Sequence, residues 1–189
     1  MMSQSYFLSN DTITTQLKRL GISNWNELIQ HIRHLQYGRN SNRHDLSLVL
    51  KEQKGSCSSK HALLKLLADR NKIPDVGLII GIYKMNPSNT PKIGDALNKT
   101  GLKFIPEAHC YLRVKGERID CTSPNSSIQN IEKDILQEQT ILPDQVVEFK
   151  IDYHRNYLKE WIQKEGIQKS FEEIWSIREK CIENLSLNK

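Results

Sequence analysis

Apolar residues recur at intervals of three and four in the first 36 residues, and this spacing predicts two amphipathic helices. The first covers residues 12–20 and ends at Gly21. The second begins near Asn24, which has the spacing of a helix-capping pair with Glu27. We therefore expect the chain to open with a helical part.

The middle of the chain combines a buried helix with several strands. Residues 57–71 are apolar on most sides, which is typical of a helix inside a core. Residues 76–83 are rich in branched apolar side chains and indicate a buried strand. Two further strands, 108–114 and 118–121, are separated by Lys115-Gly116-Glu117, which fits a two-residue hairpin turn.

The last third of the chain predicts one more strand and three helices. Residues 128–139 place apolar side chains on one side of a helix, and residues 146–151 have the composition of a strand. Helices over 153–165 and 171–185 form a C-terminal extension of the core. Together with the preceding segments, these elements predict an α+β fold.

Length and composition fit one domain over residues 1–189, with 38% hydrophobic and 26% charged residues. No stretch approaches the roughly 20 apolar residues that a membrane-spanning helix needs, and the first residues lack the pattern of a secretory signal. The chain has four cysteines, too few for a disulfide framework at this size. We therefore expect reduced thiols, a cytoplasmic location and no membrane partner.

The net charge of +5 raises the question of nucleic-acid binding. Nucleic-acid-binding proteins usually concentrate basic residues on one face, often with aromatic residues between them. Here the basic residues are scattered along the chain. We expect a solvated basic surface and no nucleic-acid partner.

Candidate chemistry centres on Cys57, in the segment Gly55-Ser56-Cys57-Ser58-Ser59-Lys60 at the predicted start of a helix. The thiolate is the reactive form of cysteine, and the positive end of a helix dipole lowers the thiol pKa. A nearby imidazolium would lower it further. A lone cysteine is more often inert, so this position needs partners.

The predicted hairpin supplies such partners in His109 and Asp120. A two-residue turn within Lys115-Gly116-Glu117 makes both side chains project from one face, on a diagonal between neighbouring strands. Asp120 would then orient the His109 ring and stabilise its protonated form. The same register sends Cys110 and Cys121 together to the other face, where we expect structural thiols away from the site.

Zinc binding is an alternative use of the same residue types. Cys57 and His61 are four positions apart and could share one helical face, with Cys110 and Cys121 as further thiols. However, the chain has no Cys-x-x-Cys pair, and the hairpin register separates those two thiols from His109. We expect no metal and no other cofactor, with His61 a polar neighbour or surface residue of the helix.

Three segments together resemble the transglutaminase-like superfamily: Gly55-Ser56-Cys57 followed by Lys60-His61-Ala62-Leu63-Leu64, then Ala108-His109-Cys110-Tyr111, then Asp120-Cys121-Thr122. The resemblance covers roughly residues 35–125 and leaves the helical extension from residue 150 outside it. It implies a papain-like core, in which a helix that begins at the cysteine packs on an antiparallel sheet bearing His and then Asp. By this resemblance Cys57 is the nucleophile, His109 the base and acid, and Asp120 the orienting residue.

An acyl-transfer site also needs donors for the oxyanion. The backbone N–H of Cys57 is the natural first donor. Gln53 is a candidate for the second, because papain-like enzymes often use a glutamine upstream of the cysteine. Further candidates in the preceding loop are Tyr37 and Asn40 as donors, and Arg39 and Arg43 for an acidic group of the substrate.

The sequence thus predicts a transglutaminase-like cysteine enzyme that acts on an amide of a peptide or protein through a thioester intermediate. Resolution of the thioester by water gives a peptidase or amidase, and resolution by an amine gives a transamidase. The alternative is a catalytically inactive module on the same fold that binds a peptide or protein. Oligomeric state does not follow from the sequence.

Overall fold

The structure is a computed structural model that describes residues 7–98 and 100–187. It is an α+β protein built around a four-stranded antiparallel sheet, with the strand order β5-β4-β3-β6. The strands are β3 (Val76–Met85), β4 (Ile105–Val114), β5 (Glu117–Ile119) and β6 (Ile135–Ile141). The predicted α+β class, with a helix packed on an antiparallel sheet, is confirmed.

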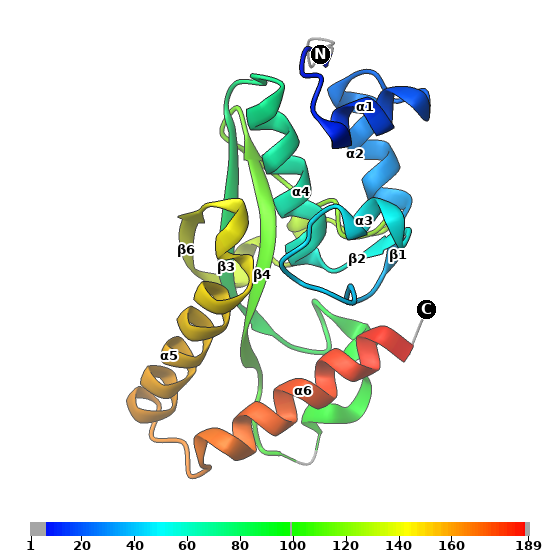
Figure 1. Ribbon diagram of the computed structural model, residues 1–189. Coiled ribbons are helices and arrows are strands. Elements are labelled where there is room, and N and C mark those ends of the chain that lie inside the picture. The colour runs from blue at the N-terminus through cyan, green and yellow to red at the C-terminus, as the bar shows by residue number, and fades with distance from the viewer. Residues whose placement is uncertain (1–6, 99, 188–189) are drawn as a thin grey trace.

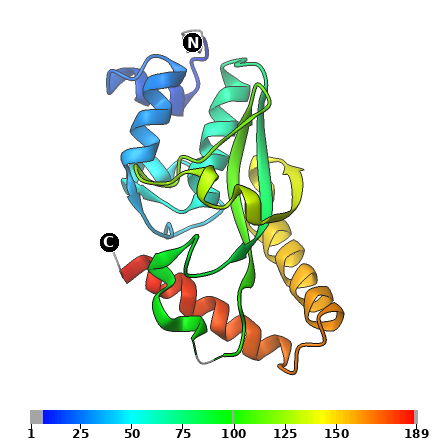
Figure 2. The same ribbon diagram turned by 180° about the vertical axis from the view of Figure 1, so that it is seen from behind.

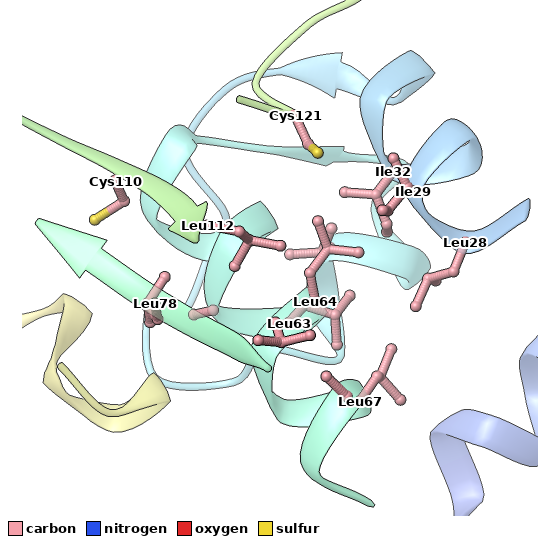
Figure 3. Packing of buried hydrophobic residues seen from close by; sticks show 14 of the residues in the cluster. Leu28, Ile29, Ile32, Leu63, Leu64, Leu67, Leu78, Cys110, Leu112 and Cys121 are labelled. Carbon is pink, nitrogen blue, oxygen red and sulfur yellow. The ribbon is translucent and has the colours of Figure 1, made fainter. Parts of the chain in front are cut away.

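The buried helix α4 (Cys57–Arg70) lies against this sheet (Figure 1). Figure 3 shows its side chains Leu63, Leu64 and Leu67 between the sheet and helix α2 (Trp25–His34). Helix α1 (Thr12–Arg19), the short helix α3 (Leu48–Lys51) and a two-stranded parallel sheet complete this side of the molecule. That small sheet joins β1 (Gln36–Tyr37) to β2 (Lys54–Gly55) and so delivers the chain to the start of α4.

Alternation along the strands divides the apolar residues into two clusters. Leu78, Ile80 and Leu112 belong to the cluster that includes α4, whereas Ile79 and Tyr111 belong to a second cluster. The second cluster is covered by α5 (Glu148–Lys164), α6 (Phe171–Leu187) and the 3-10 segment η1 (Pro91–Leu97). Figure 2 shows α6 and η1 lying side by side. The C-terminal helices therefore complete a second core, which they share with the sheet.

Two predicted elements are wrong. Residues 128–139 form no α-helix but two 3-10 turns, η2 (Ile128–Asn130) and η3 (Glu132–Asp134), followed by the edge strand β6. Ile128 and Ile131 are buried as the helical spacing implied, but pairing of the following residues with β3 prevails over local helix formation. The sheet thus overrides the local apolar spacing.

The predicted strand 146–151 is also wrong. Pro143 begins a 3-10 turn, η4 (Pro143–Val146), and α5 starts directly afterwards at Glu148. Val146 and Val147 are buried between the turn and the core, which explains a strand-like composition without a strand. The helical extension therefore begins earlier than the sequence indicated, and it includes Lys150.

Candidate active site

Cys57 is the first residue of α4, and two serines fix the helix start. The Ser56 hydroxyl accepts a hydrogen bond from the Ser59 N–H, and the Ser59 hydroxyl accepts one from the Ser56 N–H. This is a reciprocal capping box in which serine takes the usual place of Glu or Gln. Gly55 is required here because a Cβ would lie 2.8 Å from Cγ of Lys60. The chain therefore reaches Cys57 in a single, tightly packed path.

The hairpin has the predicted register. Its turn is Lys115-Gly116, so that Val114 pairs with Glu117 and Arg113 with Arg118. His109 on β4 and Asp120 just after β5 consequently lie on a diagonal, with 2.9 Å between Nε2 of the ring and Oδ2 of the carboxylate. That bond occupies Nε2 and leaves Nδ1 as the ring nitrogen available to the Cys57 sulfur.

The electrostatics of these groups favour a thiolate beside an imidazolium. Burial acts to raise the pKa of the Cys57 thiol, but Lys150 and His109 outweigh it and lower that pKa to about 6. Burial acts to lower the pKa of His109, yet the charges of Asp120 and Cys57 raise it well above its usual value. Burial likewise opposes ionisation of Asp120, while His109 keeps its pKa far below the usual range.

Asp120 and the residues that follow it are held by hydrogen bonds from two helices and from the segment itself. Its Oδ1 accepts a hydrogen bond from the Thr122 N–H at 2.9 Å, and Arg33 donates to its backbone carbonyl at 3.0 Å. The buried ammonium of Lys60 donates to the carbonyls of Leu35 and Thr122, at 2.6 and 2.8 Å. Helices α2 and α4 are thereby tied to the segment that carries the carboxylate.

His61 was expected as a polar neighbour or surface residue, but it is fully buried. Its Nδ1 donates to the Cys57 carbonyl, and its Nε2 accepts from the Cys121 N–H, both at 2.7 Å. Burial lowers its pKa to about 4, so the ring is neutral and both nitrogens are used. His61 is thus a positioning residue that links the start of α4 to the end of the hairpin.

The prediction that Cys110 and Cys121 lie together away from the site is wrong for Cys110. Both thiols are buried, but the sulfur of Cys110 lies 3.7 Å from the Ser58 hydroxyl, directly beside Cys57. Figure 3 shows Cys110 and Cys121 separated within the cluster around α4. The face opposite His109 is covered by the first turn of α4, which the hairpin register alone does not reveal.

The candidate oxyanion and substrate residues divide into two groups. Gln53 and Asn40 are occupied elsewhere: the Gln53 amide donates to the Leu50 carbonyl, and the Asn40 amide donates to Glu52 and to the Lys54 carbonyl. Tyr37 and Arg39 do line a cavity with Cys57, although Arg39 lies 3.5 Å from the carboxylate of Glu179. Arg43 lines the same cavity.

Two cavities meet at Cys57. One, of about 690 Å³, is lined by Arg39, Arg43, Lys150, Arg178 and Glu107 among others. The other, of about 610 Å³, is lined by His109, Asp120, Tyr83 and the segment 122–127. Cys57 and Tyr37 border both. Cys57 therefore borders both a charged cavity and a cavity that carries the imidazole.

Lys150 is the group that sequence reasoning missed. Its ammonium nitrogen lies 3.8 Å from the Cys57 sulfur and 2.8 Å from the Ser58 hydroxyl oxygen. It comes from the first turn of α5, outside the segment that resembles a known family. No local pattern marks the residue, because only the packing of α5 brings it to the start of α4.

Zinc is not favoured by these contacts, since both nitrogens of His61 are engaged with backbone groups. In the part of the chain that the structure describes, no group of three His, Cys, Asp or Glu side chains could hold a metal ion. In the same residues, no helix is long and apolar enough to cross a membrane.

No family model matches the chain, and no curated protein matches it. A solved structure of a candidate cysteine protease from Cytophaga hutchinsonii is similar over 73% of this chain and 45% of that one, at 15% sequence identity and a TM-score of 0.41. The chain thus spans less than half of that protein's length, and a likeness at this level carries no argument.

Proposed function

We propose that this chain is a cysteine enzyme that transfers or hydrolyses an acyl group through Cys57, His109 and Asp120. The observation that carries the proposal is the convergence of a thiol, an imidazole and a carboxylate on one cavity, with the Cys57 pKa lowered to about 6 despite burial. A buried cysteine without such partners has a raised pKa, as Cys121 and Cys181 do.

The proposed reaction follows from the positions of the three groups. The Cys57 thiolate attacks the carbonyl carbon of an amide, and the carbonyl oxygen becomes an oxyanion. His109 gives its proton to the leaving amine as the carbon–nitrogen bond breaks, which leaves a thioester on Cys57. Neutral His109 then takes a proton from the incoming water or amine, and the thiolate is released. Asp120 holds the ring and stabilises its charged form.

Selective alkylation tests this proposal. Because the thiolate is the reacting species, iodoacetamide at neutral pH should label Cys57 at least about tenfold faster than the other three cysteines, as read by peptide mass spectrometry. Labelling of Cys57 against pH should report an apparent pKa near 6. In His109→Ala that pKa should rise by at least about one unit, because the imidazolium no longer stabilises the thiolate.

Equal and slow labelling of all four cysteines would overturn the proposal and favour the non-catalytic binding module. If Cys57 is reactive, the acceptor is the next question. Incubation with a glutamine-containing peptide and a labelled primary amine, with Cys57→Ser as the blank, separates the two outcomes by mass. Amine incorporation identifies a transamidase, whereas deamidation or chain cleavage identifies a hydrolase.

A further inference from the structure

The cavity at Cys57 that His109 does not line carries a cation that the mechanism above does not use. The Lys150 ammonium contacts the sulfur at 3.8 Å, while His109 borders the other cavity. The imidazole and the ammonium therefore line different cavities at Cys57. When the carbon of a substrate carbonyl bonds to this sulfur, the carbonyl oxygen must lie close to the groups that surround the sulfur.

Lys150 is held in place by its neighbours. The ammonium donates to the Ser58 hydroxyl at 2.8 Å, and Ser58 also contacts the sulfur of Cys110. Ser58 is buried and belongs to the first turn of α4, so this contact anchors α5 to the helix start. The ammonium is thus preorganised, which is the property that makes a donor effective toward charge that develops during a reaction.

The charged groups around the Lys150 ammonium do not neutralise it. The carboxylate of Glu107 acts on this ammonium, but it is engaged by Arg178 through two hydrogen bonds of 2.6 and 2.7 Å. Burial acts against the charged form of Lys150, yet Cys110, Cys57 and Glu107 more than offset burial and raise its pKa. Lys150 is therefore protonated at neutral pH, where the Cys57 thiolate forms.

Backbone groups on the same turn complete a set of donors. The first four N–H groups of a helix have no partner within the helix. In α4 the Ser59 N–H is taken by the Ser56 hydroxyl and the Ser56 N–H by the Ser59 hydroxyl. This leaves the N–H groups of Cys57 and Ser58, next to the sulfur and on the helix turn that Lys150 contacts.

We propose that Lys150 is the second oxyanion donor of this site, acting with the backbone N–H of Cys57. In the free enzyme its charge faces the thiolate, and on attack the negative charge passes from sulfur to the carbonyl oxygen within reach of the same ammonium. The role replaces the one for which Gln53 was a candidate, since the Gln53 amide is bonded to Leu50. This inference rests on the proposed function of Cys57.

The test compares two reactions of the same sulfur. Iodoacetamide alkylates the thiolate by displacement of iodide and forms no oxyanion. 4-Nitrophenyl acetate is attacked at its carbonyl carbon, forms an oxyanion, and expels 4-nitrophenolate to leave an S-acetyl group on Cys57. Both rates scale with the fraction of thiolate, so their ratio removes the effect of a changed thiolate fraction. The nitrophenolate leaves without a proton, so the ratio also excludes proton donation by His109.

In Lys150→Met we expect the ratio of acetylation to alkylation at Cys57 to fall about 100-fold, the usual loss for one oxyanion donor. Lys150→Arg should keep the ratio within about tenfold of the unmodified chain, because the charge and donors remain. Lys164→Met, which removes an exposed charge from the same helix, is the matched control and should leave the ratio unchanged.

Three outcomes separate the possibilities. If both rates of Lys150→Met fall together with the ratio intact, Lys150 only stabilises the thiolate and the proposal is overturned. If Tyr37→Phe lowers the ratio and Lys150→Met does not, Tyr37 is the donor instead. If Cys57 of the unmodified chain is not preferentially alkylated, the proposed function itself fails. A variant that does not fold is recognised by rapid alkylation of all four cysteines.

Discussion

At the scale of single residues, the site depends on buried groups whose protonation the fold fixes. His61 illustrates this, because its neutral ring donates to one backbone carbonyl and accepts from one backbone N–H. Protonation would replace the accepting nitrogen with a second donor aimed at the Cys121 N–H. The interaction that positions the end of the hairpin therefore exists only in the neutral state.

This arrangement predicts an acid-sensitive stability. The folded pKa of His61 is about 4 and the unfolded value is about 6.5, so the unfolded chain binds the extra proton between these values. The stabilisation is complete above pH 6.5 and is lost progressively as pH falls to 4. The loss amounts to ~1.4 kcal/mol for each pH unit that separates the two pKa values. Urea unfolding at pH 7 and pH 4.5 measures this loss.

The variant His61→Gln isolates the contribution. A glutamine can offer a donor and an acceptor without titrating, so it should be less stable than the unmodified chain at pH 7 and lose less stability on acidification. Because burial also lowers the pKa of His31 and His154, some acid sensitivity should persist in the variant. Parallel pH profiles of the two proteins would contradict the assigned role of His61.

At the scale of elements, a buried ion pair joins the sheet to the last helix. Glu107 on β4 and Arg178 on α6 are both largely buried and share a bidentate contact of 2.6 and 2.7 Å. Glu107 also lies 3.9 Å from His154 of α5. These contacts bring α5 and α6 onto the strand that carries His109, and α5 in turn carries Lys150.

Removal of one partner should cost more than removal of both. Arg178→Met leaves a buried, unpaired carboxylate and should lower the free energy of unfolding by ~3–5 kcal/mol. The double variant Glu107→Gln with Arg178→Met should recover at least ~1 kcal/mol of that loss, because neither charge of the pair remains. Urea unfolding of the unmodified chain, the two single variants Glu107→Gln and Arg178→Met, and the double variant gives the coupling free energy of the pair. Additive losses would show that the pair is not coupled.

Sequence patterns predicted the elements wherever the local signal and the packing agree. The Cys57 helix start follows from small polar residues before an apolar run, and the hairpin register follows from a two-residue turn. Between residues 128 and 151 the prediction failed, because an edge strand and three 3-10 turns depend on partners distant in the chain. Lys150 was missed for that reason, because the sequence predicted a strand where the structure has the start of α5.

At the scale of the whole molecule, charge is distributed unequally around the sulfur. The 690 Å³ cavity is lined by five basic and three acidic residues, and the basic ones include Lys150 beside Cys57 and the exposed Arg43. The chain as a whole carries a net charge of +5. A positive field in a partly enclosed space raises the local concentration of anions and the rate at which they arrive.

Cys57 should therefore prefer an anionic reagent to a neutral one of the same size. At low salt, the rate ratio of iodoacetate to iodoacetamide at Cys57 should exceed that of free cysteine by about tenfold. The excess should shrink as ionic strength rises to about 0.5 M, where screening acts over a few ångströms.

Arg43→Gln should reduce the ratio, whereas Arg19→Gln, an equal charge change at an exposed site that lines none of the cavities at Cys57, should not. A ratio that matches free cysteine at every salt concentration would mean that the paired carboxylates cancel the field, and the substrate would then have no reason to carry an acidic group.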